Sequence, residues 1–403
     1  MPGRPSCDVL VIGAGVAGYT AALAAAHDGA SVMLATKLGL ASSNTAKAQG
    51  GIQAAVGPDD SPAQHAADVM AASHETANPV LVDALTGDAP AAIERLERFG
   101  VAFDHENGGY RLARCGGATR KRLLQVGDRT GHAIATALRA AVAADGRIET
   151  RDHAPLEALD QGSNGWLVSL GQKVGGIVQV EAGAVVLAAG GRCFAEAQRL
   201  GTFSTNAAGA TGEVTDVAVG VGCELRDFDA LQYHPNGGLW PPTMRGYSIP
   251  ETTRAYGALL VNVNGDRFID ELAGRDVVAD AIVRECAEGR GFVTPDGRAS
   301  VLLDCRPIPP ADAARSLPYM LKRYRAAGID PLHEPIHTYP VLHYQNGGLV
   351  IDEQGETTVG GLFAAGEITG GVHGRNRMMG NSLLDGSVFG WRAGRAAAKA
   401  ARS

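Results

Sequence analysis

The first forty residues combine apolar segments with glycines in a pattern that predicts a strand, a helix and a second strand. Residues 9–12 are apolar, residues 16–26 are rich in alanine, and residues 30–35 form a second, mainly apolar run. The motif Gly13-x-Gly15-x-x-Gly18 lies at the strand–helix junction. Its glycines permit a tight turn, close approach of the backbone to a pyrophosphate, and close helix–strand packing. The pattern therefore predicts a dinucleotide site at the helix N-terminus.

The end of the second strand lacks the residue that NAD enzymes use. An Asp or Glu usually binds the adenosine ribose at this place, whereas this chain has Ala35, Thr36 and Lys37. A plain NAD dehydrogenase is therefore disfavoured. FAD stays open if other segments complete the site, and a glycine turn without a ligand is the remaining alternative.

Further along the chain, apolar periodicity predicts helices over residues 61–99, 132–143, 214–222, 275–286 and 389–401. Alternation over residues 148–183 predicts the strands of a small sheet, and a buried strand follows over residues 184–191. Two polar, glycine-rich loops, residues 39–51 and 205–213, either press backbone against a flat ligand or lie on the surface. Proline-rich sequence over residues 240–250 marks a boundary, so we expect an inserted domain over residues 227–338.

Composition narrows the class of protein. The length of 403 residues predicts two or three domains. The net charge of −7 is mild and does not indicate the basic surface of a nucleic-acid-binding protein. No apolar run reaches the roughly 18 residues of a membrane span, and the first residues do not resemble a secretory signal. The six cysteines are scattered without a CxxC pair, so we expect no iron–sulfur or zinc site and a cytoplasmic location.

Taken in order, the short motifs resemble the flavoprotein subunits of fumarate reductase and succinate dehydrogenase, with their relative L-aspartate oxidase. The resemblance covers nearly the whole chain. Its motifs are Gly13 to Gly18, Ala48-Gln49-Gly50-Gly51, Arg129-Thr-Gly-His132, Ala189-Gly190-Gly191, Gln232-Tyr-His-Pro235, Glu251 with Arg254, Gly274-Arg275-Asp276, His343-Tyr344, Ala365-Gly366-Glu367, and Asn376-Arg377 through Asn381-Ser382-Leu383.

The resemblance implies an α/β fold with two domains. The first is a Rossmann-like FAD-binding domain of residues 1–226 and 339–403, and the second is an inserted α+β capping domain of residues 227–338. An active site is expected between them, and the C-terminal helical domain of the larger relatives is expected to be absent. The implied contacts of FAD are Gly13, Gly15, Ala17, Gly18, Thr36, Lys37, Ser43, Asn44, Thr45, Gln49, Gly50, Gly51, Ala189, Gly190, Gly191, Thr211, Gly212, Glu367, Asn381, Ser382 and Leu383.

The resemblance also implies catalytic roles. Arg275 matches the proton donor of the family, with Glu251 and Arg254 as its relay. The residues that match ligands of a substrate carboxylate are His234, His343 and Arg377. A planar guanidinium suits a carboxylate because it offers two parallel donors. The structural alternatives are a satisfied loop histidine and surface ion pairs, and no metal is expected.

The chain departs from the family at several positions. Asn44 stands where succinate dehydrogenases attach FAD through a His, so we expect noncovalent FAD. Cys115 replaces the Glu that meets the substrate ammonium in aspartate oxidases, which disfavours aspartate. Pro250 replaces a Thr that binds a substrate carboxylate, and Asn236 and Asn346 replace a Thr and a Met or Cys. We therefore expect one carboxylate subsite to be altered.

The leading hypothesis is an FAD-dependent oxidoreductase that transfers hydride between flavin N5 and a carbon–carbon bond next to a carboxylate. One alternative is an oxidase or dehydrogenase of an amino or hydroxy acid, and another is a non-catalytic flavin electron-transfer subunit. The expected partners are a small carboxylic acid and a separate electron donor or acceptor, either a protein or a reduced carrier, because the chain has no haem or iron–sulfur motif.

Overall fold

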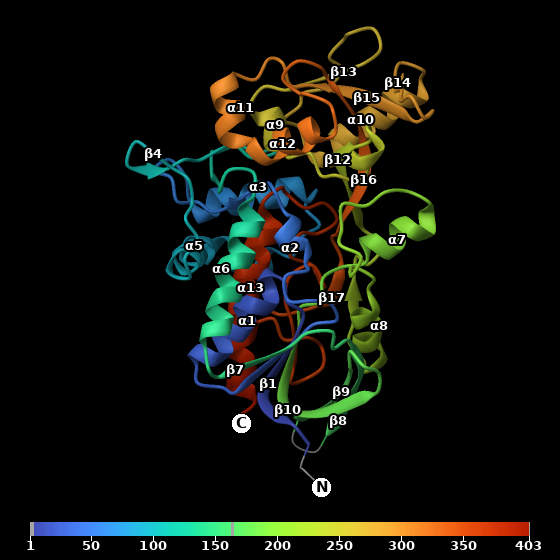
Figure 1. Cartoon of the computed structure of the whole chain (residues 1–403). Helices are drawn as coiled ribbons and strands as arrows, with labels where there is room; N and C mark the ends of the chain where they lie inside the picture. Colours follow the sequence, from blue (N-terminus) through green and yellow to red (C-terminus); the bar gives the residue numbers. More distant parts are fainter. Residues whose placement is uncertain (1–3, 163–164, 403) are drawn as a thin grey trace.

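The computed structural model describes residues 4–162 and 165–402. A seven-stranded sheet forms the base of the molecule (Figure 1). Its strands are β7 Ile148–Arg151, β2 Val32–Ala35, β1 Ser6–Ile12, β10 Ile177–Leu187, β9 Gly165–Gly171, β8 Leu156–Gly162 and β18 Leu362–Ala364. The order is β7-β2-β1-β10-β9-β8, and β18 pairs with β10. The first four strands and β18 are parallel, and β9 and β8 extend the sheet in antiparallel fashion.

The long strand β10 belongs to both parts of this sheet. Residues 177–182 pair with β9, and residues 181–187 pair with β1 on the other edge. The sequence predicted the strands of a small sheet over residues 148–183 and a buried strand after them. The strands are present, but the prediction of a small sheet was wrong, because they belong to the seven-stranded sheet. The apolar alternation runs without a break into the buried segment Val185–Leu187, so one strand continues through both parts.

Helices α1 (Val16–His27), α6 (Thr130–Ala144) and α13 (Asn381–Ala400) run side by side along the sheet (Figure 1). Contact between α1 and α13 is close because small residues line it. A Cβ atom on Gly390 would lie 2.6 Å from the carbonyl oxygen of Ala17, and one on Gly394 would lie 2.2 Å from that of Ala21. The last helix begins at Asn381 rather than residue 389. Gly386, which interrupts the apolar pattern before residue 389, also packs against α1, where a Cβ atom on it would lie 2.6 Å from Val16 Cγ1.

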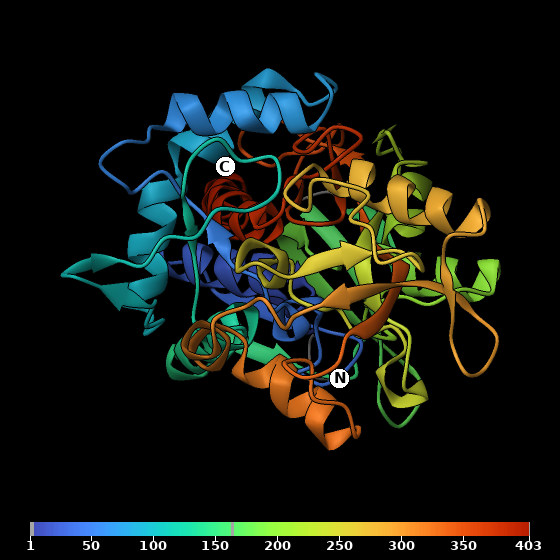
Figure 2. The ribbon, with the colours of Figure 1, turned by 90° about the horizontal axis from the view of Figure 1, so that it is seen from above.

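Above the sheet lies a second unit with its own antiparallel sheet and apolar core (Figures 1 and 2). Its strands are β12 Leu231–Gly238, β16 Ile336–Gln345, β15 Ala299–Asp304, β13 Leu259–Val261 and β14 Phe292–Val293. Its helices are η1 Pro242–Met244, α9 Thr252–Ala255, α10 Arg275–Ala287, α11 Pro310–Ser316 and α12 Pro318–Ala326. The core is closed by apolar side chains of α10, β15 and α12, such as Ile282, Leu303 and Met320.

Short elements complete the chain, and two of them, α2 (Asn44–Lys47) and α8 (Glu213–Gly220), contribute to the cavity described below. The other helices are α3 Pro62–Ala72, α4 Pro79–Gly87, α5 Ala89–Arg98 and α7 Cys193–Leu200. The strands are β3 Ile52–Gln53, β4 His105–Glu106, β5 Gly109–Tyr110, β6 Leu123–Leu124, β11 Leu225–Arg226, β17 Gly348–Val350 and β19 Thr369–Gly370. Within the described ranges, no helix has the length and hydropathy of a membrane span.

Candidate active site

One cavity runs from the glycine turn after β1 to the second sheet. Gly13 and Gly15 line one end, and His234, Arg275 and Arg377 line the other. The lining extends without a break from the glycine turn to the histidines and arginines. The cavity can therefore hold a dinucleotide at one end and a small second ligand at the other.

The turn after β1 fits a pyrophosphate. Gly13 has a φ of +117°, and a Cβ atom there would lie 2.2 Å from the carbonyl oxygen of Ala188. A Cβ atom on Gly18 would lie 1.8 Å from the carbonyl oxygen of Gly13, so both positions require glycine. The first turn of α1 carries no acidic side chain. Its positive end therefore remains available to an anion.

The end of β2 lacks an Asp or Glu of its own, but the carboxylate of Glu213, from a segment distant in sequence, lies beside it. Lys37 forms an ion pair with Glu213 at the start of α8, and both side chains contact Thr211. Lys37 and Thr211 were predicted to contact the cofactor, whereas no role was predicted for Glu213. The available signal was the acidic residue that ends the glycine-rich loop of residues 205–213.

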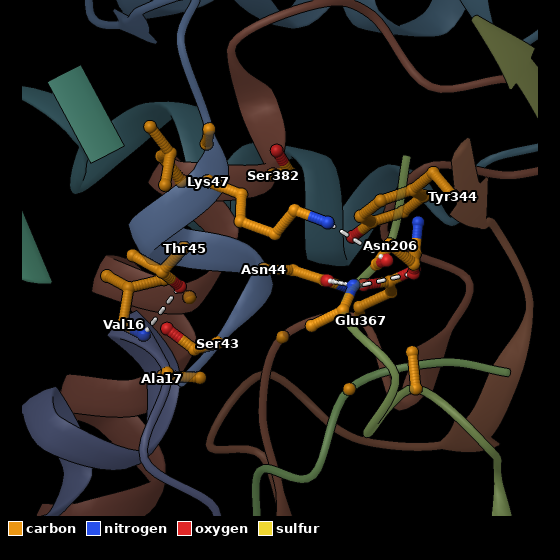
Figure 3. A pocket seen from close by; sticks show the side chains of 18 of the residues that line it. Val16, Ala17, Ser43, Asn44, Thr45, Lys47, Asn206, Tyr344, Glu367 and Ser382 are labelled. Atoms are coloured by element: carbon orange, nitrogen blue, oxygen red, sulfur yellow. Dashed lines mark hydrogen bonds between the residues drawn. The ribbon is translucent and has the colours of Figure 1, made fainter. Parts of the chain in front are cut away.

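Asn44 is held by protein contacts on the cavity wall (Figure 3). Its amide nitrogen lies 2.8 Å from Asn206 Oδ1 and 3.4 Å from Glu367 Oε2, and its amide oxygen accepts a 2.7 Å hydrogen bond from the Ala207 backbone. Burial raises the pKa of Glu367 to about 7. Near neutral pH, part of the Glu367 population is therefore protonated and can donate a hydrogen bond to a ligand oxygen.

Two neutral imidazoles meet at the other end of the cavity. His234 on β12 and His343 on β16 lie with ring centroids 5.0 Å apart. His234 Nδ1 accepts a hydrogen bond of 3.1 Å from the Asn236 backbone, and His343 Nδ1 lies 2.7 Å from Thr205 Oγ1. Burial, assisted by the nearby Arg275, lowers the pKa of both rings well below the usual value. Because its Nδ1 accepts a hydrogen bond, the neutral His234 ring can donate from Nε2, and His343 does the same when Thr205 Oγ1 donates to its Nδ1.

A buried carboxylate orients Arg275 at the start of α10. Arg275 Nε donates to Glu251 Oε2 at 2.6 Å, and Arg254 Nη2 lies 3.7 Å from the same oxygen. Burial alone would raise the pKa of Glu251, but Arg275 and Arg254 together hold it at about 2. Glu251 is therefore an anion that fixes two cations. Arg254 itself does not line the cavity.

Gln232 joins the two arginines that face the cavity. Its amide oxygen accepts from Arg275 Nη1 at 3.2 Å and from Arg377 Nη2 at 3.1 Å. The Arg377 guanidinium also lies 4.1 Å from the centroid of the Tyr344 ring. Burial and the Arg275 charge lower the pKa of Arg377 to about 10, so it stays charged at neutral pH. Sequence analysis quoted Gln232 within a motif but assigned it no role in the site.

The structure brings most of the predicted site residues to this cavity. Those that do not line it are Gly18, Gly191, Thr211, Gly212, Asn381 and Arg254. Gly18 packs on the turn, and Asn381 lies behind the wall, where its amide oxygen is 3.2 Å from His65 Nε2. Lining residues that the sequence prediction omitted include Lys47, Thr205, Asn206, Ser248, Tyr344 and Met379.

The positions that depart from the family pattern divide into two groups. Pro250 lines the cavity directly. Asn236 is fully buried with both amide atoms unpartnered, and the Asn346 amide nitrogen donates to the Arg375 carbonyl at 2.8 Å. Cys115 is buried outside the cavity lining, 3.3 Å from Gln53 Nε2, and burial raises its pKa above the usual value. It is therefore a neutral thiol.

A nucleotide-binding turn that shares one cavity with a pair of arginines and two histidines defines a dinucleotide-dependent oxidoreductase. Comparisons with known proteins agree. Residues 8–383 match the FAD binding domain family. A fumarate reductase (CoM/CoB) subunit of Methanothermobacter marburgensis is 38% identical over 98% of this chain and 73% of its own length. L-aspartate oxidase of Caulobacter vibrioides is 38% identical over 96% of this chain and 76% of its own length.

A solved structure of a fumarate reductase is also similar to this chain over nearly its whole length. A chain of a mutant E. coli quinol fumarate reductase superposes with a TM-score of 0.91 at 30% identity, covering 99% of this chain and 71% of that chain. The chain therefore belongs to the FAD binding domain family, among the flavoenzymes of the fumarate reductase and succinate dehydrogenase type. It is an oxidoreductase with noncovalent FAD, as the sequence predicted.

Proposed function

We propose that this enzyme reduces a carbon–carbon double bond next to a carboxylate, with Arg275 as the proton donor. The observation that carries the proposal is the orientation of Arg275. Glu251 holds its Nε and Gln232 holds its Nη1, whereas no described residue accepts from its Nη2. Because Arg275 lines the cavity, one guanidinium nitrogen is free to meet a substrate.

The same residues explain how the substrate would be held and protonated. Bound FAD supplies or accepts the hydride. Arg377 and the Nε2 atoms of His234 and His343 bind the carboxylate, which anchors the double bond in the cavity. Arg275 then gives a proton to the carbon that becomes negative, and Glu251 stabilises the cation before transfer and orients it. An arginine is a weak acid in water, but here it is held in line with a developing negative charge.

Pro250 in the cavity wall indicates the class of substrate. Pro250 offers neither a hydroxyl nor a backbone N–H, so it cannot donate to a second carboxylate. We propose a substrate with one anchored carboxylate and a second polar or apolar end near Pro250. The oxidase alternative has support because L-aspartate oxidases are among the relatives. Aspartate is disfavoured as the substrate, because Cys115 is a neutral thiol outside the cavity lining and cannot pair with an ammonium group.

We also propose a domain division, an electron partner and a cellular location for this enzyme. Two separate apolar cores support a division into an FAD-binding domain of residues 1–226 and 339–403 and a capping domain of residues 227–338. A separate protein or reduced carrier would supply electrons, as the name quinol fumarate reductase indicates for one relative. A cytoplasmic location agrees with six unpaired cysteines.

An anaerobic screen tests the proposal. The flavin of the holoprotein is photoreduced and then mixed separately with fumarate, with unsaturated monocarboxylic acids and with oxygen, while the return of the yellow absorbance is followed. In a parallel arm, oxidised protein is mixed with amino and hydroxy acids. We expect an unsaturated acid to reoxidise the flavin fastest. Bleaching by an amino or hydroxy acid, without reoxidation by any alkene, would establish the oxidase alternative instead.

A further inference from the structure

Lys47 places a positive charge inside the cavity. It is the last residue of α2, it is exposed along the cavity wall, and its Nζ donates to the Asn206 carbonyl at 3.0 Å. Figure 3 shows this side chain reaching toward Asn206 and Tyr344, away from the contact between Thr45 and Val16 at the N-terminus of α1. The charge therefore lies apart from the place where the pyrophosphate is expected.

The charge of Lys47 is not compensated. Two other cations that line the cavity have carboxylate partners, since Lys37 is paired with Glu213 and Arg275 with Glu251. Among the described residues, no carboxylate lies within ion-pair distance of Lys47, and its hydrogen-bond partner is a neutral carbonyl. A cation at the cavity wall attracts any negative charge that develops in the cavity, with the moderate strength expected near a protein surface.

Its position coincides with the junction between the two ends of the cavity. Asn206, which accepts from Lys47, also donates from its side chain to the His343 carbonyl at 2.6 Å and accepts from Asn44 at 2.8 Å. Gln49 follows two residues later and also lines the cavity. A ring that exchanges hydride with an acid between His234 and His343 must lie at this junction, because the nucleotide end lies beyond it.

We propose that Lys47 raises the reduction potential of the bound flavin by placing an uncompensated positive charge beside its ring. Reduction adds negative charge to the ring, and a neighbouring ammonium stabilises that charge. The effect would offset the lower potential expected when Asn44 replaces the His of a covalent flavin link. The inference rests on FAD binding and, for the position of the ring, on the acid site of the proposed function, but not on which acid is bound.

The test compares neutral and charged replacements in the holoprotein without substrate. Lys47→Gln keeps a hydrogen-bond donor, Lys47→Met removes it, and Lys47→Arg keeps the charge. One readout is the two-electron midpoint potential from dye equilibration. We expect both neutral variants to lower it by about 30 mV, which is a tenfold change in the equilibrium constant, and Lys47→Arg to stay near the wild type.

Sulfite provides a second readout. It bonds through sulfur to the oxidised flavin and leaves negative charge on the ring without any electron donor. The dissociation constant of the adduct should rise at least tenfold in both neutral variants, by the same charge argument. Lys322→Met is the matched control, because it removes an exposed lysine of α12 that does not line the cavity. It should leave the potential and the sulfite affinity at their wild-type values.

Three results would overturn the proposal. The first is an unchanged potential in both neutral variants, and the second is an equal change in Lys47→Arg and Lys47→Met. In the third, Lys47→Gln resembles the wild type while Lys47→Met does not, which would assign the effect to the hydrogen bond. Each potential is referred to measured FAD content, so loss of cofactor is scored separately. The screen of acids can fail without affecting these readings.

Discussion

Arg275→Ala should lower the rate of alkene reduction by about 10³-fold, within the range of roughly 10²–10⁴ that a positioned acid contributes. The expected loss follows from the geometry, since Arg275 Nη2 is the guanidinium nitrogen left free beside the cavity. FAD content and the visible spectrum should stay unchanged, because Arg275 lies at the acid end. Stopped-flow reoxidation of the photoreduced variant by the best acid from the screen measures the effect.

A control on the same helix separates chemistry from folding. Arg284 lies on α10 with an exposed side chain, so Arg284→Ala should retain the wild-type rate. Unchanged turnover in Arg275→Ala would remove the proton role of this residue. A loss of similar size in Arg284→Ala would attribute the effect to damage of the helix.

Glu251→Gln should produce the second large effect, on both rate and stability. The change removes the anion that holds Arg275 at 2.6 Å and faces Arg254 at 3.7 Å, so two buried cations are left without a counter-ion. Breaking a buried pair costs roughly 3–5 kcal/mol of stability. We expect the rate of alkene reduction to fall about 10²-fold, because a guanidinium that is no longer oriented donates less efficiently.

The pH dependence of this stabilisation has a definite sign. The pKa of Glu251 is about 2 in the folded chain, below the roughly 4.3 of a free glutamate. Its contribution is therefore complete above about pH 5 and is lost as the pH falls through roughly 4 toward 2. Thermal unfolding from about pH 5 to about pH 8 should show a constant deficit in Glu251→Gln. Glu196→Gln breaks a surface pair and serves as control; an equal deficit there would contradict the buried-anion account.

Local patterns in the sequence predicted the fold far better than the contacts of the site. The glycine turn and its flanking strands follow from residues that are neighbours in sequence. Glu213 meets Lys37 and Gln232 bridges the two arginines only because distant segments fold together. Similarly, the glycines of α13 obscured its start, since their role is contact with α1 and not helix formation.

The family motifs predicted residues that the structure brings to one cavity, but not their state of charge. Burial makes both histidines neutral and Glu367 partly protonated, and burial depends on the whole fold. Lys47 shows the same limit, because nothing in the sequence near it reveals that no carboxylate of the described residues faces it. A sequence pattern gives the residue type, whereas the surroundings decide the electrostatics.

The central claim is that FAD and a carboxylic acid share one cavity. Titration of the oxidised holoprotein with saturated mono- and dicarboxylic acids, followed by flavin absorbance, tests it most directly. We predict a saturable spectral change in the wild type. In Arg377→Met the affinity for the acid should fall roughly tenfold to a hundredfold, because a charged hydrogen bond is lost. The affinity should be unchanged in Arg375→Met, whose exposed side chain pairs with Asp229. A flavin spectrum unaffected by every acid, or equal affinity in Arg377→Met, would contradict the account.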